Sequence, residues 1–109
     1  MMNRQRKYCM LANWKCHGTT DFVRDIVTNL INDLEYNPDH LDFLVLPGML
    51  HLNLAKARIN DYISVASQNV AKTGNGAFCG EVSASMLADC GVNWVMVGHN
   101  ERRRLYDEN

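Results

Sequence analysis

Two short segments of this 109-residue chain carry side chains that could bind a phosphate and polarise a carbonyl group. Asn13 and Lys15 follow the apolar run 8–12, and His99 follows the apolar run 92–97. Lysine, histidine and asparagine can together donate hydrogen bonds to an oxygen that becomes negatively charged during a reaction. These residues would converge on one pocket if the two runs are strands with their carboxyl ends at the same edge of a sheet.

The residues around His99 predict the start of a helix. Gly98 permits a tight turn after the strand, Asn100 is a good N-cap residue, and Glu101 suits the first helical turn. The positive end of a helix dipole disfavours an imidazolium, so we expect His99 to be neutral and to donate a hydrogen bond. On the residues alone, a purely structural or solvent-facing histidine is the alternative.

Four apolar or β-branched runs have the length of strands, at residues 8–12, 41–46, 62–67 and 92–97. Helical patterns separate them, which predicts an α/β fold of four parallel strands with crossover helices. The runs are apolar on both faces, as a covered parallel sheet requires. Periodicity leaves two architectures open, namely an open doubly wound sheet and part of an eightfold barrel, which is complete at about 250 residues.

The segments between these strands carry helix signals. Residues 19–21 offer N-caps for a first helix, which we expect to include Leu34 and to stop at residues 37–39. A second helix is predicted at about 50–60, and a third at 83–90, begun by its serine and ended by the following glycine. The apolar face predicted for the second helix consists of Leu50, Leu54, Ala57 and Ile59.

The composition indicates an ordered globular chain without a general affinity for nucleic acid or membranes. Apolar residues make up 47%, charged residues 21%, and the net charge is −1. No apolar run approaches the roughly 20 residues that span a bilayer. Arg4, Arg6 and Lys7 precede an apolar segment that is too short for a secretory signal. We interpret them as a basic lead-in to the first strand, with a short mitochondrial presequence as the alternative.

The four cysteines form no C-x-x-C pair, so the sequence predicts neither a zinc site nor any other metal site. With no secretory signal, a reduced cytoplasmic chain is expected. Cys9 and Cys90 lie in apolar contexts, and we expect both to be buried free thiols.

Three motifs resemble the triosephosphate isomerase family. LANWKCHG is similar to the family's N-W-K-x-N-G segment, SQNVAKTGNGAFCGEVS to its long third loop, and MLADCGVNWVMVGHNERR to its fourth strand and following turn. The motifs keep the family's order and separations and cover residues 8–109. The resemblance implies that residues 1–109 are the N-terminal portion of a single (β/α)8 TIM-barrel domain.

The resemblance also implies a reaction, the interconversion of dihydroxyacetone phosphate and glyceraldehyde 3-phosphate in glycolysis and gluconeogenesis, without metal or cofactor. By family match, Lys15 holds the substrate phosphate and oxyanion, Asn13 contacts the substrate oxygens, and His99 moves a proton between them. A neutral histidine at this helix start is already the known arrangement in this family. Glu101 matches a glutamate paired with the lysine, with an ordinary first-turn carboxylate as the alternative. Asn100 replaces the family's serine.

Residues 68–81 resemble a family loop that inserts into a neighbouring subunit, which implies a homodimer. Phe78 lies near the loop tip, Cys79 replaces a threonine that reaches the partner's active site, and Cys16 lies where the partner's loop docks. A thiol is a weaker hydrogen-bonding group than a hydroxyl. An ordinary surface loop and a flexible ligand loop are the alternatives. His17 also departs from the family, which has asparagine there.

In the family the catalytic base, the mobile lid and the phosphate-binding glycine loops lie in later barrel units. We therefore expect this chain to supply the electrophilic half of the site, to be inactive alone, and to need a complementing C-terminal half. Two alternatives are a non-catalytic half-barrel interaction or scaffold subunit and an unrelated open α/β phosphate-binding module. A cytoplasmic location is expected, with an organellar copy as the alternative.

Overall fold

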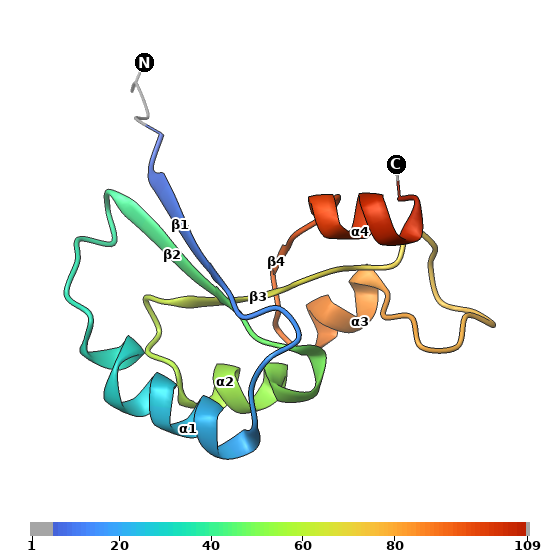
Figure 1. Cartoon of the computed structure of the whole chain (residues 1–109). Coiled ribbons are helices and arrows are strands. Elements are labelled where there is room, and N and C mark those ends of the chain that lie inside the picture. The colour runs from blue at the N-terminus through green and yellow to red at the C-terminus, as the bar shows by residue number, and fades with distance from the viewer. Residues whose placement is uncertain (1–5, 109) are drawn as a thin grey trace.

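The computed structural model describes residues 6–108 and contains four parallel strands (Figure 1). Arg4 of the basic lead-in lies outside the described residues. The strands are β1 (Tyr8–Asn13), β2 (Leu41–Leu46), β3 (Ser64–Ser67) and β4 (Trp94–Val95). The α-helices are α1 (Thr20–Asn29), α2 (Leu52–Arg58), α3 (Ala84–Asp89) and α4 (Asn100–Tyr106). Two short 3-10 helices are η1 (Ile31–Asp33) and η2 (Met49–His51).

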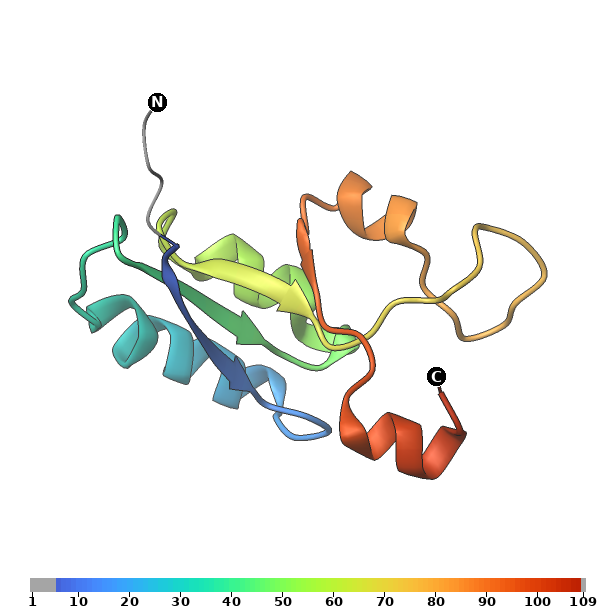
Figure 2. The same ribbon diagram turned by 90° about the horizontal axis from the view of Figure 1, so that it is seen from above.

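The strands follow one another in the sheet in chain order, β1-β2-β3-β4. An open doubly wound sheet reverses its strand order at a switch point, whereas a barrel adds each strand beside the previous one. The predicted α/β fold with four parallel strands and crossover helices is therefore confirmed, and its strand order is that of a partial barrel. The two orthogonal views show the strands as a twisted, open layer (Figures 1 and 2).

The register brings the carboxyl ends of the strands to one edge of the sheet. Tyr8 pairs with Leu41 and Asn13 pairs with Leu46, so β1 and β2 end together. The Met96 N–H donates to the Ser67 carbonyl at 2.9 Å, which continues the β3–β4 ladder past β4. The segments after β1 and β4 therefore leave the sheet at the same edge.

Helix α1 begins as predicted but ends early. The Thr19 hydroxyl caps it by accepting the Phe22 N–H at 3.1 Å. The helix stops at Asn29, and the expected continuation to Leu34 was wrong. Asn32 explains the difference, because its carboxamide oxygen accepts the Asn60 N–H at 3.0 Å, which ties this segment to the end of α2.

Helix α2 is shorter than predicted and rotated. Its first turn is the 3-10 helix η2, and the buried face consists of Leu52 and Ala55, while Leu50 is 92% exposed. Of the predicted face, Leu54 and Ile59 do pack against the core, whereas Leu50 and Ala57 are exposed because the 3-10 turn shifts the helical phase. Helix α3 follows the prediction, with Ser83 as N-cap and Gly91 (φ +78°) after its end. No helix within residues 6–108 is long and apolar enough to cross a membrane.

Two apolar clusters cover the two faces of the central strands. The larger cluster joins the sheet to the helices, and it consists of Val23, Val27, Ile31, Phe43, Val45, Leu52, Ala55, Ile63, Val65, Leu87 and Val92. The smaller cluster lies on the opposite face and consists of Leu44, Leu46 and Ala66, with Met96 against it. Because alternate residues of β2 enter different clusters, β2 is buried on both faces.

The outer strands differ from the expected covered sheet. Residues 8–11 of β1 and both residues of β4 are exposed, and Cys9 and Cys90 are exposed too, so their predicted burial was wrong. Each outer strand has a neighbour on one side only, and Cys90 lies at the C-terminal end of α3. The apolar residues of β1 and β4 reflect strand propensity, not burial within this chain.

Candidate active site

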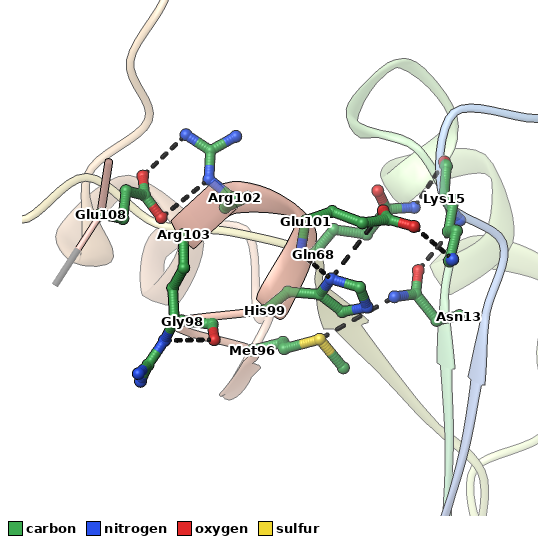
Figure 3. Close-up of polar contacts among 10 residues, drawn as sticks. All are labelled: Asn13, Lys15, Gln68, Met96, Gly98, His99, Glu101, Arg102, Arg103 and Glu108. Atoms are coloured by element: carbon green, nitrogen blue, oxygen red, sulfur yellow. Dashed lines mark hydrogen bonds and ion pairs between the residues drawn. The ribbon is translucent and has the colours of Figure 1, made fainter. Parts of the chain in front are cut away.

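The site lies at the carboxyl edge of the sheet, between the segments that follow β1 and β4 (Figure 3). Asn13 is the last residue of β1, and Lys15 follows two residues later. On the other side, His99 is the N-cap of α4 and Asn100 is the first helical residue. The expected N-cap was Asn100, so this assignment is corrected. The histidine ring itself accepts the Glu101 N–H, so the N-cap lies one residue before the asparagine that capping preferences favour.

The backbone of Lys15 is held in an unusual conformation. Its φ of +53° lies in the left-handed region, which is rarely occupied by residues other than glycine, asparagine and aspartate. The Lys15 N–H donates to the Asn13 carboxamide oxygen at 2.9 Å, and the Lys15 carbonyl accepts from the Gln68 carboxamide at 2.8 Å. Strain of this kind persists only where surrounding contacts over-determine it and is commonest at functional sites.

Gln68 is a site residue that sequence reasoning missed. Its carboxamide nitrogen donates to the Lys15 carbonyl and to the Leu46 carbonyl, each at 2.8 Å, and so links the ends of three strands. The available signal was its position directly after the predicted strand 62–67. The same rule had selected Asn13 and His99.

Lys15 and Glu101 form an ion pair that bridges the two sides of the site. The ammonium nitrogen lies 2.6 Å from a Glu101 carboxylate oxygen, with the side chains 48% and 40% exposed. The hydrogen bond from Lys15 lowers the pKa of Glu101 below its usual 4.5, and the charges of Lys15, His99 and Arg104 act in the same direction. Glu101 is therefore ionised near neutral pH and bound to a cation.

The hydrogen bond to the His99 ring fixes which ring nitrogen carries a proton. Nδ1 accepts the Glu101 N–H at 3.1 Å, so Nδ1 has no proton and a neutral ring must carry its proton on Nε2. The other ring nitrogen points toward Asn13 (Figure 3). The Asn13 carboxamide in turn lies 3.8 Å from the Met96 sulfur, close to the end of β4. The arrangement can thus present a neutral N–H donor beside an ammonium group.

A family model for triosephosphate isomerase matches residues 8–109. The chain belongs to the triosephosphate isomerase family. A chloroplastic triosephosphate isomerase from Fragaria ananassa is 39% identical over 102 residues, covering 94% of this chain and 32% of the relative. A cytosolic triosephosphate isomerase from Oryza sativa subsp. japonica is 42% identical over 103 residues, covering 94% of this chain and 41% of the relative. The chain thus spans about a third to two fifths of the length of these relatives.

The structure brings together four of the residues that the triosephosphate isomerase resemblance implied, and Asn100 follows His99 as the first residue of α4. Asn13, Lys15, His99 and Glu101 lie in one cluster. The loop expected at 68–81 is closed at its base by the bond from the Ala71 N–H to the Val82 carbonyl at 2.8 Å, so that residues 71–82 project from the sheet (Figure 1). Phe78 on this loop is 48% exposed. Cys79 and Cys16 are exposed free thiols.

The part of the chain that the structure describes contains no metal site beside the cluster of Asn13, Lys15, His99 and Glu101. There, no group of three or more histidine, cysteine, aspartate or glutamate residues could hold an ion. The charged groups of the site are Lys15 and Glu101, and the ring of His99 lies beside them. The chemistry that these residues can perform is anion binding and stabilisation of an oxyanion.

Proposed function

We propose that this chain supplies the electrophilic half of a triosephosphate isomerase active site, for the interconversion of dihydroxyacetone phosphate and glyceraldehyde 3-phosphate. The observation that carries the proposal is the convergence of Asn13, Lys15 and His99 at the carboxyl ends of β1 and β4. Their elements are joined by the 2.6 Å ion pair between Lys15 and Glu101. Active sites of parallel α/β barrels lie at this edge.

In the proposed reaction, each side chain acts on a different part of a phosphorylated triose. The ammonium of Lys15 has three donors, so two of them are free for the phosphate and the developing oxyanion while the third holds Glu101. The Nε2–H of His99 donates to the substrate carbonyl oxygen and then exchanges its proton between the two oxygens of the enediolate. The Asn13 carboxamide orients the same oxygens.

Glu101 is a poor candidate for the base that removes the carbon-bound proton. The bond from Lys15 lowers its pKa, which weakens it as a proton acceptor near neutral pH. We therefore propose that the base comes from a complementing polypeptide segment that completes the barrel. The chain alone is then expected to be inactive, and no metal or cofactor takes part.

We also propose a homodimer through the loop of residues 71–82, on the basis of its exposed Phe78 and the family resemblance. One relative is cytosolic and the other chloroplastic by name. We propose a cytoplasmic location for this chain, with an organellar location as the alternative.

A chimera tests the proposed function directly. Residues 8–109 replace the matching segment of the cytosolic isomerase from Oryza sativa, and isomerase turnover is measured with both triose phosphates. We expect turnover that falls by about 100-fold or more in Lys15→Met and in His99→Gln. Lys56→Met and His51→Gln are the matched controls, and they should retain activity.

Two outcomes would contradict the proposal. A folded chimera that binds its substrate but shows no turnover would favour the non-catalytic scaffold alternative. Turnover by the isolated 109-residue chain that depends on His99 would show that the base is already present in it.

A further inference from the structure

The peptide groups on either side of His99 are both bound by one residue, Arg103. The Arg103 side chain donates from Nε to the Gly98 carbonyl at 2.8 Å, and the Arg103 backbone N–H donates to the His99 carbonyl at 3.1 Å. The first carbonyl belongs to the peptide before the His99 Cα, and the second belongs to the peptide after it. Because φ and ψ of a residue are set by its two flanking peptides, Arg103 restrains both angles of His99.

Gly98 and Arg103 fit each other. Gly98 has a φ of +67°, and a Cβ atom there would lie 2.9 Å from Nη2 and 3.1 Å from Nε of Arg103. The guanidinium thus occupies the space that any other residue would need for its side chain. A left-handed glycine and an arginine five residues later together make the turn from β4 into α4.

The backbone angles of His99 decide what its ring can reach. With φ of −54° and ψ of 142°, His99 is outside the helix but directs Nδ1 onto the Glu101 N–H at 3.1 Å. This bond selects the tautomer with its proton on Nε2. A different ψ would move Nδ1 away from that N–H and release the ring.

We propose that Arg103 is a positioning residue for His99: by clamping the Gly98 carbonyl it holds the His99 backbone in the conformation that keeps Nδ1 as an acceptor and Nε2–H as the donor. This inference rests on the proposed role of His99 as the electrophile. It adds a residue whose side chain acts on the Gly98 turn and not on Lys15.

The neighbouring arginines provide contrast and control. Arg102 makes a bidentate pair with Glu108, at 2.9 and 2.8 Å, and within residues 6–108 its side chain makes no hydrogen bond to the Gly98 carbonyl. For Arg104, the structure shows neither a side-chain hydrogen bond nor an ion pair within residues 6–108. Arg104→Ala therefore removes the same charge from the same helix without removing the clamp.

The tautomer of His99 is the readout, because a merely structural arginine would not change it. The full chain is labelled with ¹⁵N at histidine, and two-bond ¹H–¹⁵N correlations are recorded at about pH 9, where histidine is neutral. His99→Gln assigns the His99 signals. The exposed His17 and His40 give the tautomer ratio of a free ring in the same sample.

We expect His99 to favour the Nε2–H tautomer more strongly than His17 and His40 do. In Arg103→Ala this ratio should fall by about threefold or more, toward the exposed histidines. Arg103→Lys keeps the charge but not the Nε donor, so it should follow Arg103→Ala. Arg104→Ala should leave the ratio unchanged.

Unchanged His99 signals in a folded Arg103→Ala, checked by circular dichroism, would overturn the inference. If Arg103→Ala does not fold, Arg103→Lys is judged by the same criterion. A wild-type His99 without the Nε2–H preference would also overturn it. If the unmutated chimera is inactive, but Arg103→Ala still lowers the Nε2–H preference of His99 in the full chain, only the proposed function is contradicted.

Discussion

The two inner strands and the two outer strands of this sheet are stabilised in different ways. In β2 and β3, residues 43–46 and 65–67 are buried, whereas residues 8–11 of β1 and both residues of β4 are exposed. Most candidate site residues lie at or after the ends of the outer strands, and Gln68 alone follows an inner strand. Burial therefore fixes the centre of the sheet, but it does not fix the site.

Hydrogen bonds and ion pairs hold the site instead. Gln68 extends from the buried end of β3 to the Lys15 carbonyl, and Lys15 reaches Glu101 on α4. The first link joins the segment after β1 to the buried strand β3, and the second joins it to the segment after β4. The precision of the site therefore depends on a few polar contacts, while the stability of the chain depends on the inner strands. The following four tests challenge this division.

The largest effect should come from a cavity in the inner strands. Leu46 is 1% exposed, so Leu46→Ala should lower the free energy of unfolding by about 2–5 kcal/mol. Leu11 is 48% exposed, and the same change there should cost well under 1 kcal/mol. Urea unfolding followed by circular dichroism compares the two. Equal losses would mean that the outer strands share the core.

Removing the link between the inner and outer strands should have the next largest effect. Gln68→Ala deletes the donor shared by the Lys15 and Leu46 carbonyls and should cost about 1–3 kcal/mol. Amide hydrogen exchange should accelerate at residues 14–16 and stay slow in β2. Uniform acceleration across the sheet would show that Gln68 supports the whole fold and not the site alone.

A smaller effect is expected at the cap of α3, where the hydroxyls of Ser83 and Ser85 both donate to the Asn75 carboxamide oxygen. Ser83 is 4% exposed and accepts the Met86 N–H at 3.2 Å, so Ser83→Ala should cost about 1 kcal/mol. Ser85 is exposed and also reaches Asn75, but it caps nothing, and Ser85→Ala should stay within about 0.5 kcal/mol. Thermal unfolding ranks them, and the reverse order would contradict the link between burial and cost.

The smallest effect should be the titration of the ion pair between the outer segments. Lys15 lowers the pKa of Glu101 below 4.5, so the pair stabilises the folded chain above this pH. That contribution is lost as the pH falls through the lowered pKa of Glu101. A ¹³C titration of the Glu101 carboxylate should show a midpoint below 4.5, which Lys15→Met raises. Lys56→Met should leave this midpoint unchanged. A shift of the midpoint in Lys56→Met would mean that the pKa of Glu101 depends on the overall charge of the chain and not on Lys15.

The sequence predicted those features of the fold that depend on neighbouring residues. The strand segments and the caps at Thr19 and Ser83 follow from local patterns, and both caps are observed. The early end of α1 could not be predicted in this way. It depends on the bond between Asn32 and Asn60, which are 28 residues apart.

The candidate site shows the same limit. Position after a strand was enough to select Asn13, Lys15 and His99, but not the conformation of each. The left-handed φ of Lys15 carries no residue signal, because lysine rarely adopts it. His99 replaces Asn100 as the cap because its ring happens to reach the Glu101 N–H, and helix-capping preferences do not include that geometry.

The consecutive order of the strands has a consequence for synthesis on the ribosome. Each strand pairs with the one made just before it, so the chain can build its sheet outward from β1 without waiting for distant sequence. Such pairing keeps contacts between residues close in the chain and shortens the loops that must close during folding. A nascent chain of this kind can grow by adding one unit at a time, and only the newest strand has to find its neighbour.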